Sequence, residues 1–528
     1  FGPNPEAQHR LQVGLAGATS ASGQPGLAAW SGLEHHWRVI SSTETAQWRY
    51  TPPIVGTALK SLSGGYVSAE FTGGGAARFG QHIRNIEVSG KLGGTLLSSF
   101  TDLPTYFATV HYNKLPFFEA IANIPKSMTP VARAELVEFM NSQGMIADTL
   151  IDNLNRFSAE NIAPSWSGRV SAKTMHLGLV NWWTEGLRRS FALTMMQGTS
   201  KTLATPWGSL DEWTREMLLA RRGITESDWG VMQSASQLPT EWGNLLTPEA
   251  IYATGHPDAA SVATKYLGLL SRESEYAVVE PDVAARAFLR RGTVAGTVPG
   301  EAARYIAQFK AFPVAMFTRH WRRILETPGG LEGAPLGFRS EGPVDRLAFL
   351  GSLVVTLTAL GAISLQAREL KEGRDPIDMT TAKFWTRALA QGGGLGFFGD
   401  VMLRDSTDDR SPQQGLFELL GPAAGSAAQL FELTKGNVDE YLAGKTTHAG
   451  AEAVQLARAH TPFVNLWYAK AALDHAGLHA LQESLSPGYL SRIRSRARKS
   501  WGNDYWWQPG SGLPDRGPSF EDLAGASL

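Results

Sequence analysis

Signals that start and end helices recur along most of this chain, and they constrain its fold more than any other feature. Ser209 and Glu212 have the spacing of a capping box, and Gly223 is typical of a residue just past a helix end. Thr225 and Asp228 predict a further helix start. We therefore expect helices over most of the chain.

Strand signals, by contrast, are scarce. Residues 70–72 and 85–89 are the best alternating candidates, and both are short. No repeat at a fixed period is visible, which argues against a solenoid. The sequence predicts an all-α fold, an elongated multi-helix assembly with glycine-punctuated helices and irregular connections.

Composition narrows the functional classes. The 528 residues carry a formal charge of −1, so no strong overall field attracts DNA or anionic lipid. Charged residues make up only 18%, below the roughly 25% of ordinary soluble domains, which indicates surface hidden in an oligomer or in lipid. Cysteine is absent, which excludes disulfides, Cys-ligated zinc, iron–sulfur clusters and thiol catalysis.

Four zones differ in composition. Residues 1–125 are glycine-rich and predict an irregular helical region, and residues 126–343 predict amphipathic helices ending in a linker. Residues 344–485 form a low-charge helical region, and residues 486–528 a basic and aromatic tail. The chain starts with Phe1 and an opening unlike a signal peptide, so we interpret it as a processed product or the carboxyl-terminal part of a longer polypeptide.

Motifs with catalytic or binding chemistry are weak. Residues 394–399 match GxGxxG, but a helix is predicted before them where nucleotide binding needs a strand. His475 and His479 have a spacing that can hold a metal, without an evident third ligand, and a surface helix explains them as well. Glu483-Ser484 resembles the acid of lytic transglycosylases in two residues only. The sequence thus predicts no catalytic, cofactor-binding or metal-binding residue.

Residues 347–365 form a run of 19 residues without a charge, which as a helix spans about 28 Å, close to the roughly 30 Å of a bilayer core. A buried core helix is the alternative. The candidates for membrane contact are Leu347, Val354, Val355, Leu360 and Leu365. Small residues at four-residue spacing downstream permit close helix packing, in lipid or in an oligomer. These helix-packing candidates are Gly392, Gly396, Gly421 and Gly425.

Two basic segments are candidate contact surfaces. Residues 304–325 predict an amphipathic helix kinked at Pro313, either a core-facing helix with a solvated basic edge or a helix on a membrane or nucleic acid. In the tail, arginines run directly into aromatic residues, which suits phosphate with base stacking or lipid headgroups with an interfacial belt. The contact candidates are Lys310, Arg319, Trp321, Arg322, Arg323, Arg492, Arg494, Arg496, Arg498, Lys499, Trp506 and Trp507.

Several short motifs carry a resemblance. They are Gln308-Phe309-Lys310-Ala311-Phe312-Pro313, Arg319-His320-Trp321, Gly399-Asp400, Gly421-Pro422, Leu485-Ser486-Pro487-Gly488-Tyr489-Leu490 and Tyr505-Trp506-Trp507-Gln508-Pro509. Across residues 90–515 the chain resembles the carboxyl-terminal part of large bacteriophage internal virion proteins, the ejection or internal core proteins of short-tailed phages. The resemblance implies a protein packed in the capsid and expelled with the genome, which helps build a conduit across the host envelope. Some relatives carry a peptidoglycan-cleaving domain near their amino terminus, and no residue here matches its active site.

The sequence-based hypothesis is therefore a non-enzymatic ejection protein, located in the virion interior and, after ejection, in the host cell envelope. Its expected partners are further copies of itself, portal or other ejection proteins, phage DNA and the host inner membrane. Two alternatives remain open at this point. One is an envelope-degrading peptidoglycan hydrolase, and the other is a soluble protein that packs DNA inside the capsid.

Overall fold

The computed structural model describes residues 69–94, 96–100, 102–129, 165–240, 243–279, 289, 293, 297–308, 311–392, 422–444, 447 and 449–520. Within these ranges the fold is all-α, as predicted, apart from one antiparallel ribbon of β1 (Leu238–Thr240) and β2 (Gly243–Leu245). Both predicted strand candidates are wrong, because residues 70–72 and 85–89 lie in helix α4 (Ala69–Lys91). The buried positions 77, 81, 84 and 88 of α4 recur at helical spacing, and this long pattern overrides the short alternations.

The first group of elements surrounds one long buried helix, α11 (Val180–Thr202), whose side chains are mostly inaccessible to solvent. Leu187, Phe191 and Met196 lie at the centre of this core. The other elements of the group are η1 (Leu92–Gly94), α5 (Leu96–Ser99), α6 (Asp102–Tyr112), α7 (Phe117–Met128), α10 (Trp166–Leu177), η2 (Trp207–Ser209), η3 (Trp213–Leu219), η4 (Ala220–Arg222), α12 (Glu226–Ser234), α13 (Pro248–Tyr252) and α14 (Ala259–Ala277).

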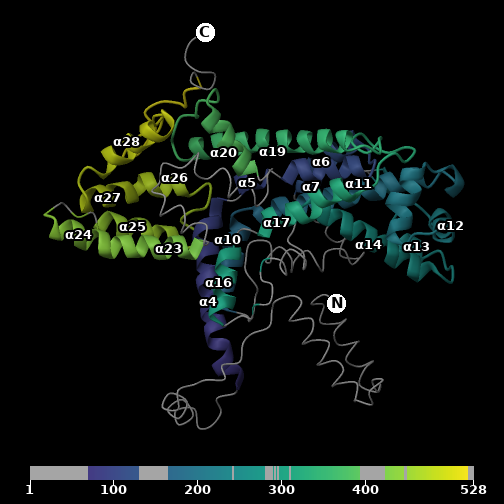
Figure 1. The fold of residues 1–528 in the computed structure, drawn as a ribbon, viewed down its shortest axis with the longest axis horizontal. Helices are drawn as coiled ribbons and strands as arrows, with labels where there is room; N and C mark the ends of the chain where they lie inside the picture. The colour runs from purple at the N-terminus through teal and green to yellow at the C-terminus, as the bar shows by residue number, and fades with distance from the viewer. Residues whose placement is uncertain are drawn as a thin grey trace.

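The remaining elements follow a less regular segment. They are α16 (Val298–Ala307), α17 (Ala311–Met316), η5 (Phe317–Trp321), α18 (Arg322–Glu326), α19 (Pro343–Lys371), α20 (Ala382–Gly392), α23 (Pro422–Phe431), η6 (Glu432–Gly436), α24 (Asn437–Leu442), α25 (Ala449–His460), α26 (Lys470–Leu473), η7 (Asp474–Leu478), α27 (His479–Leu485) and α28 (Tyr489–Trp501). In Figure 1, α4 and α16 stand upright between the first group on the right and helices α23 to α28 on the left, while α19 and α20 run along the upper edge.

The predicted start of a helix at Thr225 and the predicted helix end at Gly223 are confirmed. Thr225 and Asp228 form a capping box at the start of α12, and Gly223 adopts the left-handed φ of 76° just past η4. The prediction that Ser209 caps a helix is wrong. The helical segment begins after Asp211, whose carboxylate accepts a hydrogen bond from the Thr214 amide at 3.0 Å. An Asp side chain two residues later satisfies the same exposed amides that Ser209 was expected to satisfy.

Helix α19 joins the two compositional zones that meet near residue 343. Its N-terminal half contributes Leu350, Leu353 and Leu357 to a core shared with Trp213 and Phe338. Its C-terminal half packs with α20 in a smaller core. Residues 126–343 and 344–485 therefore share a core around α19.

The C-terminal helices are attached to α4 by a close backbone approach. A Cβ on Gly90 would overlap the carbonyl oxygen of Ala459 at the end of α25. The Asn465 side chain donates to the Gly90 carbonyl at 2.6 Å, and the Trp467 amide donates to the Gly93 carbonyl at 3.1 Å. Glycine in α4 thus lets a segment more than 350 residues away in the sequence touch the helix backbone.

Candidate functional site

The outer side of α19 is the most distinctive surface of the described chain. Among the described residues α19 is the helix that is long and apolar enough to cross a membrane, and only 33% of its most apolar stretch is buried. Its exposed large side chains recur along one side of the helix at Val344, Leu347, Val355 and Ile363. The opposite side packs on the core, so α19, which runs along the upper edge of the ribbon in Figure 1, carries an apolar stripe that the other described elements leave exposed.

The predicted membrane-contact residues divide between these two sides. Leu347 and Val355 are 56% and 68% exposed and lie on the outer stripe. Val354 and Leu360 are half-buried. Leu365 is only 3% exposed and packs against α20, so its prediction as a membrane contact is wrong. Leu365 lies on the side of α19 that packs against α20.

Three hydroxyl groups in the uncharged run form hydrogen bonds within α19. Ser352 donates to the Phe349 carbonyl at 2.7 Å, and Thr356 donates to the Ser352 carbonyl at 2.8 Å. Thr358 donates to the Val354 carbonyl at 2.7 Å. Because a hydroxyl that bonds the preceding turn does not need water, these residues make the stripe less polar than the sequence indicates.

Of the predicted helix-packing glycines, Gly392 makes its close contact inside the chain. A Cβ on Gly392 would overlap the Leu357 carbonyl oxygen, and one on Gly361 would overlap that of Ala388. Gly392 is therefore a contact between α20 and α19 of the same molecule. Gly425 is half-buried in α23, and Gly396 and Gly421 lie outside the described residues, as does the GxGxxG segment.

The single amphipathic helix predicted for residues 304–325 is wrong. Helix α16 ends at Ala307. The next residue, Gln308, is extended, with a φ of −60° and a ψ of 128°, and its side chain donates to the Arg84 carbonyl at 2.9 Å. Helix α17 restarts at Ala311, which places Pro313 in its first turn. A proline there removes no helical hydrogen bond, so the break lies before it and not at it.

Two predicted basic contacts of this segment are internal. Arg319 is 6% exposed and pairs with Glu275 at 2.9 Å. Arg323 pairs with the buried Glu273 at 2.7 Å. Their prediction as membrane or nucleic-acid contacts is therefore corrected. Arg322 is exposed and pairs with Glu326, Trp321 is half-buried, and Lys310 lies outside the described residues.

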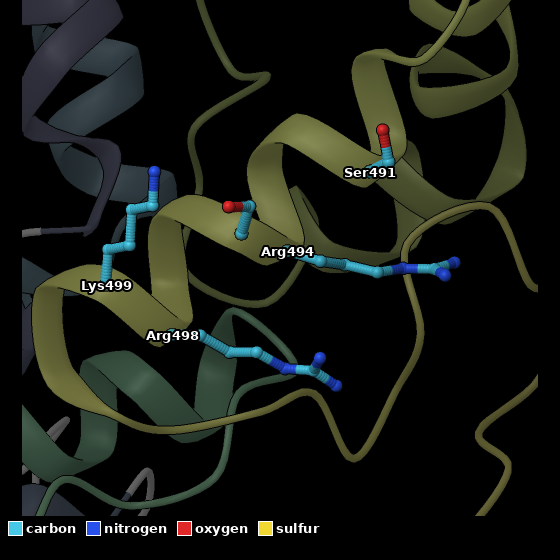
Figure 2. A pocket seen from close by; sticks show the side chains of 5 residues that line it. Ser491, Arg494, Arg498 and Lys499 are labelled. Atoms are coloured by element: carbon cyan, nitrogen blue, oxygen red, sulfur yellow. The ribbon is translucent and has the colours of Figure 1, made fainter.

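The basic face of α28 is the second candidate site, and it contains a shallow pocket of about 410 Å³. Helical spacing places its lining residues on successive turns, and Figure 2 shows the Arg494 and Arg498 side chains extending to the same side. The lining residues are Ser491, Arg494, Ser495, Arg498 and Lys499. Every side chain of this lining can donate a hydrogen bond and none is acidic, which suits an anion.

Not all the cations of α28 are equally available. Arg492 donates to the backbone carbonyl of Pro487 at 3.1 Å, and Arg494 donates to that of Pro509 at 3.2 Å. Arg498 pairs with Asp504 at 2.6 Å but is 64% exposed at its side chain. Arg496 and Lys499 are exposed. The face therefore keeps a surplus of positive charge.

The aromatic residues of the tail are used internally. The Trp507 ring stacks on His475 with ring centres 4.0 Å apart, and its indole donates to the Ser511 carbonyl at 3.2 Å. Trp506 is half-buried, and its amide donates to the Gly373 carbonyl. The prediction that Trp507 contacts a partner is corrected, because its ring is stacked on His475. The backbone amides of Trp506 and Trp507 attach the tail to Gly373, just past the C-terminal end of α19, and the contact role of Trp506 stays a prediction.

The histidines and the acid considered for chemistry also have structural contacts. His475 donates to the Ser511 carbonyl at 3.1 Å, and its ring meets that of His479 edge-on. Within the described ranges no group of three or more metal-ligating side chains occurs. Glu483 accepts from the Gly488 and Leu490 amides at 2.7 and 2.8 Å, which lowers its carboxyl pKa and caps α28. A general acid needs a raised pKa instead.

Sequence reasoning missed a charged cluster at the C-terminal end of α19. Lys470 pairs with Glu372 at 2.5 Å, and Arg374 bridges Glu372 and Glu369. Burial raises the pKa of Glu369, while Lys470 and Arg374 outweigh burial at Glu372 and lower its pKa to about 2. Nothing in the local sequence pairs these residues, because Lys470 lies about a hundred positions from Glu372.

Comparison of the chain with protein-family models, with curated proteins and with solved structures gives no match.

Proposed function

We propose that this chain is an oligomerising structural component of the conduit that carries a phage genome across the host cell envelope. In this proposal it is packed in the virion interior and reaches the host membrane after ejection. The supporting observation is the outer stripe of α19, which is apolar and uncovered along the length of the helix. The resemblance to internal virion proteins supplies the biological setting.

The stripe needs a partner on energetic grounds. Fully burying a side chain of the size of Val, Leu or Ile stabilises by about 1.5 to 3 kcal/mol. Val344, Leu347, Val355 and Ile363 are each more than half exposed, so lipid that covers them recovers several kcal/mol. The internally bonded hydroxyls of Ser352 and Thr356 lower the cost of that transfer.

Substituting Val355 tests this proposal. Val355→Asp places a charge in the middle of the stripe, and at a bilayer centre it should cost about 2.5 to 3.5 kcal/mol, a roughly 70- to 400-fold loss of insertion. Because Val355 is 68% exposed, the melting temperature of the free chain should change little. Flotation with neutral phosphatidylcholine vesicles measures the loss of membrane insertion, and thermal unfolding measures the change in melting temperature.

The matched control is Val438→Asp on α24, the same change at a side chain that is 55% exposed. It should leave vesicle binding as in the unmodified chain. In phage, Val355→Asp should give virions that assemble and adsorb but fail to deliver DNA. Equal vesicle binding by both variants and the unmodified chain would contradict the proposal.

A further inference from the structure

The basic pocket of α28 lies close to one end of the apolar helix. Trp501, the last residue of α28, packs against the small core formed by α19 and α20. Lys383 of α20 donates to the Ser500 carbonyl at 3.0 Å and lies over the Trp501 ring at 4.9 Å. The pocket residues Arg498 and Lys499 are one turn or less away along the same helix. The pocket is therefore held beside the C-terminal half of α19.

Formal charge differs between the two ends of α19. At the N-terminal end Arg339 and Arg346 are balanced by Glu341 and Asp345. At the C-terminal end, residues 368–375 contain three basic and three acidic side chains and are balanced as well. The positive surplus beside the C-terminal end comes from α28, which carries five basic side chains, of which Arg498 pairs with Asp504. An apolar helix with a cationic surround at one end matches a bilayer whose surface at that end is anionic.

The pocket itself fits a phosphate group. Ser491 and Ser495 provide hydroxyl donors, and Arg494, Arg498 and Lys499 provide cations. Guanidinium groups bind phosphate oxygens through charge-assisted hydrogen bonds. The volume of about 410 Å³ leaves room for more than one phosphate, as a substituted headgroup requires.

A lipid fits these observations better than nucleic acid. Single-stranded nucleic acid is held by base stacking, and the nearby Trp507 ring is already stacked on His475. Lipid would also cover the exposed apolar side chains of α19 beside the pocket, which a charged duplex would not. We propose that the α28 pocket binds the phosphate of an anionic phospholipid headgroup and fixes the C-terminal end of α19 at an anionic membrane surface. This inference rests on the proposed membrane contact of α19.

A pair of substitutions at Ser495 tests the pocket with minimal change of shape. Ser495 is exposed on the pocket face, and Asp and Asn are nearly equal in size, so Ser495→Asp and Ser495→Asn differ in charge alone. The probe is vesicles of phosphatidylcholine with and without phosphatidylglycerol, and binding of the full chain is measured by flotation. One charge near an anionic surface changes binding about fivefold.

The expected result is specific to the anionic vesicles. Ser495→Asp should weaken binding to phosphatidylglycerol vesicles about fivefold relative to Ser495→Asn, with equal binding of the two to neutral vesicles. The double variant Arg498→Gln with Lys499→Gln should bind phosphatidylglycerol vesicles about 25-fold more weakly than the unmodified chain. Arg496 lies outside the pocket, so Arg496→Gln should weaken this binding less than Arg498→Gln or Lys499→Gln alone. Added salt should weaken the anionic component because it screens exposed charges.

Failure of this inference and failure of the proposed function give different results. If the unmodified chain binds neutral and anionic vesicles equally, or if Ser495→Asp and Ser495→Asn bind alike, the headgroup site is refuted while α19 remains a membrane contact. If Val355→Asp binds neutral vesicles normally, the membrane role of α19 is refuted. If Ser495→Asp weakens binding of duplex DNA and leaves anionic vesicles unaffected, the pocket is a nucleic-acid site and the inference is overturned.

Discussion

At the scale of single residues, the described protein places charged groups in its interior and pairs them over long sequence distances. Glu273 is 1% exposed and accepts from Arg222, Arg323 and Asn113. Burial alone would raise its carboxyl pKa, but Arg323 and Arg222 outweigh burial and lower it. The Arg323 guanidinium lies over the Tyr112 ring at 3.4 Å. Such a group is costly to break, because removing one partner leaves a buried charge unpaired.

His320 makes this cluster sensitive to acid. Its ring is buried, donates to the Tyr276 carbonyl at 2.7 Å and faces Arg319 and Arg323, so burial and these cations lower its pKa to about 3. The unfolded value is about 6.5, so as pH falls below 6.5 the unfolded chain takes up a proton first and stability is lost. Between pH 7 and pH 5 the loss from this site should be about 2 kcal/mol.

Comparison with His320→Gln measures that contribution. Urea unfolding of both chains at pH 7, 6 and 5 should show a shallower fall for the variant, whose amide can still donate to Tyr276. The lowered pKa values of His475 and His479 act in the same direction in both chains and cancel in the difference. Parallel curves for the two chains would contradict the assignment.

At the scale of elements, α19 and α20 pack with their backbones almost in contact. Gly361 and Gly392 face each other's helix, and at both a Cβ would overlap a backbone carbonyl oxygen. Glycine costs a helix about 1 kcal/mol relative to alanine, so glycines in helices need a reason of this kind. On the outer side of the same helix, a Cβ on Gly351 would meet no atom within 4 Å beyond the adjacent helix backbone.

Alanine substitutions at these glycines should have opposite effects. Gly361→Ala or Gly392→Ala forces the helices apart and should destabilise by about 1 to 3 kcal/mol. Gly351→Ala meets only open space and should stabilise by up to about 1 kcal/mol through helix propensity. Chemical denaturation of the three variants tests this, and a similar change at all three positions would be inconsistent with the close packing.

At the scale of the whole molecule, the last described segment fastens the C-terminal helices to α19. Asn503 is buried and donates to the Asp375 carbonyl at 2.8 Å, and the Asp375 amide donates to the Asp504 carbonyl at 2.8 Å. Arg516 pairs with the Asp375 carboxylate. The segment therefore closes the turn between α19 and α20 from outside.

Truncation after Gly502 should open this turn. The shortened chain loses the partners of Asp375 and Glu369, which leaves buried polar groups unsatisfied at a cost of about 1 to 3 kcal/mol each. Limited proteolysis should then cut within residues 372–381 faster than in the full chain. Truncation after Phe520 keeps all of these contacts and serves as the control. Equal cleavage rates in the two shortened chains would refute the fastening role.

The sequence by itself determined the features that depend on neighbouring residues. The all-α class, the capping box of Thr225 and Asp228, the end at Gly223 and the long apolar helix around residues 347–365 all follow from signals within one or two helical turns. Such signals act through backbone hydrogen bonds that reach only three or four residues, which is why they can be recognised locally.

Only the tertiary structure decided how those helices are used. In the folded chain the helical segment of residues 304–325 is interrupted at Gln308, and the side chains of Arg319 and Arg323 are buried. Leu365 lies in the core, whereas Val355 is exposed. Each outcome depends on partners far away in sequence: the Gln308 side chain bonds the Arg84 carbonyl 224 positions before it. A periodic pattern records that one side of a helix is buried, but the group that covers it is set by packing between distant segments.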